Sequence, residues 1–110
     1  MNNNTPNSIP LVCLRENGAF NAGQQERYGA IRRQLATAVK ESQELVDGYA
    51  LRFVPEGSLI MALAEFITLE RLCCGFFRFT LEVEAQGGPI WLRLSGPEGV
   101  KEFLKSELNL

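Results

Sequence analysis

The sequence predicts an α+β fold, a two-layer sandwich in which an antiparallel sheet of three to four strands carries helices on one face. Apolar residues recur at helical spacing over 22–44 and over 59–74. Apolar and polar residues alternate, as they do in strands, over 49–54, 76–84 and 90–94. A chain of 110 residues, 45% of them hydrophobic, is long enough to bury one core. We therefore expect one domain over 9–110, after a polar, Asn-rich segment, 1–8, that we expect to be disordered.

The first half of the chain begins with a short apolar run, Ile9 to Leu14, which is either a strand or an ordered lead-in. A long helix is predicted over 22–44. Asn21 is its expected N-cap, because Gln24 follows at the spacing of a capping box, and Asp47-Gly48 is expected to end it. Its apolar face consists of Tyr28, Ile31, Leu35, Ala38 and Val39.

The second half alternates strands and helices. The strand over 49–54 leads through the turn Pro55–Ser58 into a helix over 59–74, with Ser58 as its cap and Gly75 at its end. The strand 76–84 and the returning strand 90–94 are joined by a turn at Gln86–Pro89. A last helix opens at Gly96-Pro97-Glu98, with Pro97 in the first helical position.

This order of elements restricts the topology. A right-handed β-α-β crossover places the strand 49–54 beside the strand 90–94. The result resembles a ferredoxin-like sandwich that lacks its last strand. We expect the open edge of the sheet to be filled by Ile9–Leu14 or by a second subunit.

Composition excludes several kinds of function. The chain has no histidine, so a Ser-His-Asp triad, a Cys-His pair and histidine-containing zinc sites are ruled out. Its net charge of -2 argues against a nucleic-acid partner. The N-terminal residues lack the features of a signal peptide, and no apolar run is long enough to span a membrane. We therefore expect a cytoplasmic protein without a membrane partner, in which the three cysteines are reduced.

The helix 59–74 contains the most informative residues. Successive side chains on a helix turn by about 100°. On this helix Glu70 falls in the middle of the apolar arc, with Cys73 and Cys74 on either side of it at i+3 and i+4. Because a carboxylate among core residues is costly unless it is paired or coordinated, Glu70 requires a partner.

Three interpretations of this cluster remain open. Cys73 and Cys74, with Cys13 as a third sulfur and Glu70 as a ligand or proton acceptor, are suited to a soft metal ion such as Zn(II) or to another thiophile. Alternatively, the protein is a thiol-dependent redox enzyme in which Glu70 accepts the proton, although a helix C-terminus disfavours a thiolate. In the third interpretation the cysteines pack as small core residues of a structural, dimeric interaction domain.

The outward face of the predicted sheet gathers aromatic and basic side chains: Arg52, Arg78, Arg93, Trp91 and Phe76. Such a face is either an anion-binding platform or a solvated surface with ion pairs to Glu82 and Glu84. Trp91 among arginines also favours a contact between two copies in a homodimer. The segment Gly96–Gly99 lacks the spacing of a phosphate-binding loop and is interpreted as a turn.

Two stretches carry a resemblance to known sequences: Phe66-Ile67-Thr68-Leu69-Glu70-Arg71-Leu72-Cys73-Cys74-Gly75-Phe76-Phe77-Arg78-Phe79 and Trp91-Leu92-Arg93-Leu94-Ser95-Gly96-Pro97-Glu98-Gly99. They resemble a group of small uncharacterised bacterial proteins with an E-R-x-C-C-P-F core, over about nine-tenths of the chain from Cys13 onward. Gly75 replaces the usual proline. The resemblance implies no activity, but such proteins also place a cysteine near the N-terminus, which supports grouping Glu70, Cys73, Cys74 and Cys13 as one unit.

Overall fold

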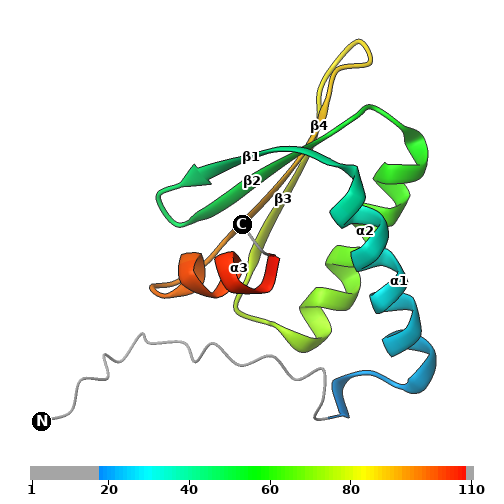
Figure 1. Ribbon diagram of the computed structural model, residues 1–110, viewed down its shortest axis with the longest axis vertical. Coiled ribbons are helices and arrows are strands. Elements are labelled where there is room, and N and C mark those ends of the chain that lie inside the picture. Colours follow the sequence, from blue (N-terminus) through cyan, green and yellow to red (C-terminus); the bar gives the residue numbers. More distant parts are fainter. Residues whose placement is uncertain (1–17, 109–110) are drawn as a thin grey trace, which may run out of the picture.

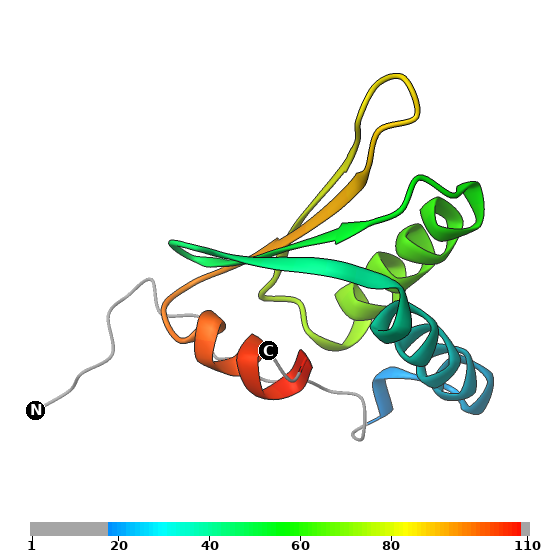
Figure 2. The ribbon, with the colours of Figure 1, turned by 45° about the horizontal axis from the view of Figure 1, so that its top comes forward.

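The computed structural model describes residues 18–108, which form three helices and a four-stranded antiparallel sheet (Figure 1). In chain order the elements are α1 (Ala22–Ala38), β1 (Val39–Leu45), β2 (Gly48–Phe53), α2 (Gly57–Cys73), β3 (Arg78–Val83), β4 (Ile90–Ser95) and α3 (Val100–Leu108). The helices lie on one face of the sheet (Figure 2). The predicted α+β two-layer sandwich is therefore confirmed.

The strand order is β1-β2-β4-β3, and each neighbouring pair is antiparallel. β2 lies beside β4, with Gly48 opposite Ser95 and Phe53 opposite Ile90, as the crossover rule predicts. α2 is the crossover, because it connects β2 to β3 on the two sides of β4. The β3–β4 turn forms where predicted, and Gln86 and Gly87 both have positive φ, as a tight hairpin requires.

The predicted helix over 22–44 is wrong in its second half. α1 starts at the predicted cap, with the reciprocal Asn21–Gln24 hydrogen bonds of a capping box, but it ends at Ala38. Val39 turns to an extended conformation, and Val39–Leu45 becomes β1, which pairs with β2. β1 thus fills the sheet edge that the sequence left to Ile9–Leu14 or a second subunit. Ile9–Leu14 and the segment 1–8 lie outside the described residues.

Two other helix starts also differ from the prediction. α2 begins at Gly57 after Glu56, whose side chain makes no capping hydrogen bond, so Ser58 is not the cap. α3 begins at Val100 rather than at Pro97, and the Val100 N–H bonds to the Pro97 carbonyl in the preceding turn. These shifts leave the helical faces unchanged.

The core lies between the sheet and the three helices. Alternate residues of β4 are buried, whereas Trp91, Arg93 and Ser95 between them are partly exposed. The largest fully buried side chains of the described residues come from every layer: Phe53, Ile31, Leu63, Ile90, Leu92, Leu94, Leu104 and Val100, with Cys73 and Cys74 among them. The two cysteines therefore lie inside the core and not at its surface.

Candidate functional site

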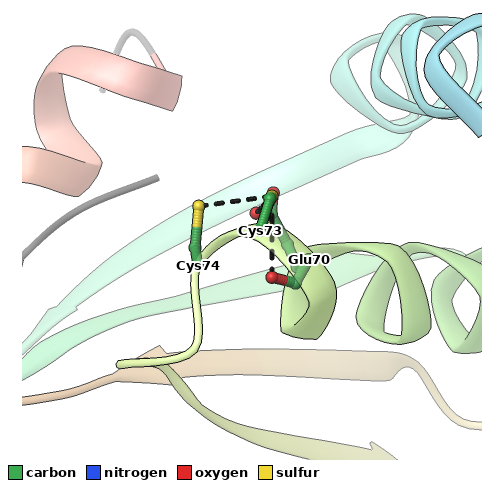
Figure 3. Close-up of side chains that lie close together, drawn as sticks. All are labelled: Glu70, Cys73 and Cys74. Carbon is green, nitrogen blue, oxygen red and sulfur yellow. Dashed lines mark hydrogen bonds between the residues drawn. The ribbon is translucent and has the colours of Figure 1, made fainter. Parts of the chain in front are cut away.

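The C-terminal end of α2 brings Glu70, Cys73 and Cys74 together (Figure 3). Glu70 is 5% exposed, and it is the one buried polar or charged side chain among residues 18–108. Cys73 and Cys74 are 1% and 0% exposed. Cys74 is disulfide-bonded, so the expectation that all three cysteines are reduced is wrong for this residue. The position of Glu70 inside the apolar face, inferred from the helical wheel, is confirmed. Cys13, the predicted third sulfur, lies outside the described residues.

The distances between these side chains are short. The Sγ of Cys73 lies 3.5 Å from Oε1 of Glu70 and 3.4 Å from Sγ of Cys74. One donor atom from each residue lies within 4.8 Å of the others. Adjacent side chains on a regular helix point apart, so two neighbouring sulfurs would not meet there. Cys74 is the C-cap and has left the helical conformation, with φ -127° and ψ 73°, so its sulfur comes close to that of Cys73.

Tyr28 is a fourth member of this cluster that sequence reasoning missed. Its hydroxyl donates a hydrogen bond of 2.6 Å to Oε2 of Glu70, across the interface between α1 and α2. The tyrosine is 6% exposed, and its ring packs between Phe20 and Phe66. The sequence placed Tyr28 on the apolar face of its helix. Its hydroxyl group could have indicated the contact, because a buried tyrosine normally finds a hydrogen-bond partner and Glu70 was the buried acceptor.

A second polar link fixes α1 against α2 outside the core. The guanidinium of Arg27 donates two hydrogen bonds of 2.8 Å to the carboxylate of Glu65. Glu65 is five residues before Glu70, and Arg27 is next to Tyr28. This ion pair therefore links the same two helices that carry Tyr28 and Glu70.

We expect the substitution Arg27→Met to raise the pKa of Glu65 back towards its ordinary value. The hydrogen bond from Arg27, helped by its charge, lowers the pKa of that carboxyl in the folded protein. A lowered pKa means that the pair stabilises the fold near neutral pH and that this contribution is lost as the pH falls through the pKa of the folded state. Titration of the Glu65 carboxyl carbon by NMR measures the shift. Arg33→Met, also on the exposed side of α1, is the control, and an unchanged Glu65 pKa in Arg27→Met contradicts the prediction.

The outer face of the sheet is a surface of paired charges. Arg52 bonds to Glu41 at 2.8 Å, Arg93 to Glu82 at 3.0 Å, and the indole N–H of Trp91 to Glu84 at 2.7 Å. These pairs match the solvated surface with ion pairs that was one of the predicted alternatives. The surface also includes β1, which carries Glu41.

Phe76 does not belong to this outer face. It is 7% exposed and packs against Phe77 and Phe103, because β3 begins only at Arg78 and residue 76 turns into the core. The placement of Phe76 beside Trp91 was therefore wrong.

The fold and the cluster define a small α+β domain with a buried carboxylate and two sulfurs at one helix end. No protein-family model, no curated protein and no solved structure matches this chain. Within residues 18–108, none of the helices has the length and apolar character needed to cross a membrane. The chemistry of the cluster is therefore inferred from its own geometry.

Proposed function

We propose that this protein binds a soft metal ion such as Zn(II), or another thiophile, through Cys73, Cys74 and Glu70, with Cys13 as the third sulfur. The observation that carries this proposal is the convergence of three buried donor atoms within 4.8 Å. Thiolate sulfur selects soft ions, and the carboxylate oxygens of Asp and Glu also bind zinc in proteins.

The spacing of the donors supports a shared ion. In a tetrahedral zinc site with Zn–S bonds of about 2.3 Å and Zn–O bonds of about 2.0–2.2 Å, neighbouring ligand atoms lie roughly 3.5–3.8 Å apart. The observed separations from Sγ of Cys73 are 3.4 Å to the other sulfur and 3.5 Å to Glu70. Binding therefore requires that the disulfide of Cys74 is first reduced, after which the donors, now within 4.8 Å of one another, need to close by about 1 Å at most.

The two carboxylate oxygens of Glu70 have different partners. Oε1 faces the sulfur of Cys73, whereas Oε2 accepts the hydrogen bond from Tyr28. A ligand whose second atom is held by a hydrogen bond is oriented before the ion arrives, and such outer partners typically change metal affinity by about 10–100-fold. Tyr28 is therefore a positioning residue for Glu70.

The two other interpretations make different demands. A redox enzyme needs a thiolate that substrates reach, but Cys73 is 1% exposed and lies at a helix C-terminus. A structural role is favoured by the bond from Tyr28, which gives Glu70 a partner without any metal. We place the protein in the reducing cytoplasm, where the disulfide of Cys74 would be reduced and its sulfur could bind an ion. We also propose a homodimer formed through Trp91 on the outer face of the sheet.

Native mass spectrometry of the reduced protein with Zn(II), and separately with Hg(II), tests the metal site. We expect one ion per chain in the wild type and none in Cys73→Ser/Cys74→Ser, because the double substitution removes two of the proposed sulfurs. Loss of affinity in Cys13→Ser supports Cys13 as the third ligand. Equal metal binding by the wild type and the double variant, or binding by neither, overturns the proposal.

A matched pair of carboxylate variants tests the role of Glu70. Glu70→Gln and Glu65→Gln make the same change on α2, but Glu70 is buried beside the sulfurs and Glu65 bonds to Arg27 at the surface. We expect Glu70→Gln to weaken Zn(II) binding, measured by competition with a chelating dye, and Glu65→Gln to leave it unchanged. If both variants bind as tightly as the wild type, Glu70 is not a ligand. If the cysteine and Glu70 variants lower the free energy of unfolding but leave Zn(II) binding unchanged, the structural interpretation holds.

A further inference from the structure

A cavity of about 420 Å³ lies between the sheet, the end of α1 and the end of α3. Leu51 and Phe53 of β2 and Leu94 of β4 line it from the sheet, and Leu35 and Val39 line it from the end of α1 and the start of β1. α1 packs on α2, whereas α3 packs on β2. α1 and α3 therefore lie apart on the same face of the sheet (Figures 1 and 2). Protein interiors usually leave few voids larger than a water molecule. A cavity of this size and lining is therefore suited to an occupant.

The walls of the cavity specify an apolar occupant. Its inner surface comes from aliphatic and aromatic side chains that also belong to the core or pack against it. An apolar cavity of about 150 Å³ holds one benzene molecule, so this cavity of about 420 Å³ has room for roughly three rings. Preformed, mostly apolar clefts of about 300–1,000 Å³ are typical of small-molecule sites.

The charges at the edge of the cavity specify the other end of the occupant. Arg32 and Glu107, which line it, have side chains that are 31% and 30% exposed. The guanidinium donates one bond of 2.6 Å to the Glu107 carbonyl and one of 3.5 Å to its carboxylate. Because the two charges offset each other, this edge favours neither an anion nor a cation. It does offer a donor and an acceptor to a polar group.

We propose that this cavity binds an uncharged, largely apolar small molecule of about three rings, with one hydrogen-bonding group directed at Arg32 and Glu107. This function is separate from metal binding. Neither Cys73 nor Cys74 lines the cavity, and Phe66 contributes to its wall on the side of α2. The two proposals therefore stand or fall independently.

Two fluorescent probes with the same ring skeleton test the proposal on the full chain. N-phenyl-1-naphthylamine is uncharged and carries one N–H donor, whereas 1-anilinonaphthalene-8-sulfonate adds a negative charge to that skeleton. We expect saturable one-to-one binding of the uncharged probe and weaker binding of the sulfonate. Equal or tighter binding of the sulfonate, or no saturable binding of the uncharged probe, overturns the proposal.

Substitutions at one exposed alanine locate the binding site. Ala36 lines the cavity but is exposed on α1, so Ala36→Trp fills the cavity without replacing a core residue. Ala64→Trp makes the same change on an exposed position of α2 that does not line the cavity. We expect the affinity for the uncharged probe to fall roughly tenfold or more in Ala36→Trp, less in Ala36→Leu, and not in Ala64→Trp.

The same variants separate the alternatives. Equal probe binding by Ala36→Trp, Ala36→Leu and the wild type overturns the assignment of this cavity. A wild type that is dimeric in analytical ultracentrifugation and becomes monomeric in Ala36→Trp shows that a second copy occupies the cavity, which also overturns it. Cys73→Ser/Cys74→Ser is expected to bind the probe as the wild type does, whether or not the metal proposal holds.

Discussion

Replacing Tyr28 with phenylalanine is expected to destabilise the protein by about 1.5–3 kcal/mol, although the change removes a single oxygen atom. That oxygen donates the 2.6 Å hydrogen bond to Oε2 of Glu70, and both residues are buried. A buried charged group that loses a hydrogen-bond donor keeps the cost of its desolvation. Urea unfolding, followed by circular dichroism, measures the difference in the free energy of unfolding.

The second of the two tyrosines in the sequence provides the control. Tyr49 lies on β2 and is partly exposed, so Tyr49→Phe is expected to change stability by no more than about 0.5 kcal/mol. The double variant Tyr28→Phe/Glu70→Leu is expected to be more stable than Tyr28→Phe, because it removes the carboxylate along with its donor. If Tyr28→Phe unfolds at the same urea concentration as the wild type, the hydrogen bond contributes no stability.

The same substitution separates positioning from folding. Because Tyr28 holds the second oxygen of Glu70, Tyr28→Phe is expected to weaken Zn(II) binding by about 10–100-fold at a temperature where the variant is folded. Tyr49→Phe is expected to bind Zn(II) as the wild type does. A purely structural Tyr28 would lower stability and leave the affinity for the ion unchanged.

The substitution Gly48→Ala is expected to cost at least about 3 kcal/mol, or to prevent folding, since overpacking against rigid atoms is strongly destabilising. A Cβ atom at residue 48 would lie 1.8 Å from the carbonyl oxygen of Leu94 and 2.8 Å from Cα of Ser95. Both are backbone atoms of β4, the strand that pairs with β2 along its whole length. The two inner strands of the sheet would have to separate at the end where Gly48 pairs with Ser95.

Gly57→Ala is the matched control for this prediction. Gly57 is the first residue of α2, and a Cβ atom there meets nothing within 4 Å among the described residues. We expect this variant to be as stable as the wild type or slightly more so, because alanine favours helix and restricts the unfolded chain. Thermal unfolding of both variants measures the contrast. A Gly48→Ala protein as stable as Gly57→Ala would show that β2 and β4 move apart at little cost.

Gly48 also illustrates why the sequence misplaced one strand. Asp47-Gly48 was correctly identified as a break, but it lies at a hairpin and not at the end of a helix: Val46 and Asp47 form the turn, and Gly48 begins β2. β1 has exposed side chains from Lys40 to Glu44, so it has no alternation of apolar and polar residues to distinguish it from a polar helical face. Pairing with β2, which is a tertiary interaction, decides its conformation.

The candidate site was predictable to the extent that it depends on one helix. The positions of Glu70 and Cys73 follow from helical periodicity, which the sequence encodes directly. The approach of Cys74 depends on the backbone leaving the helix, and the bond from Tyr28 depends on how α1 packs against α2. Neither is a property of a local pattern, so both required the structure.

The edge strand β1 also affects how the protein behaves at high concentration. Exposed sheet edges recruit further strands, and this is a common route to amyloid-like aggregation. β1 presents Lys40, Glu41 and Glu44 within five residues, and Glu44 bonds to Lys101 of α3. A strand added to this edge would have to bring its own charges into register with these and displace α3 from Glu44. The polarity that concealed β1 in the sequence thus protects the folded chain against extension of its sheet.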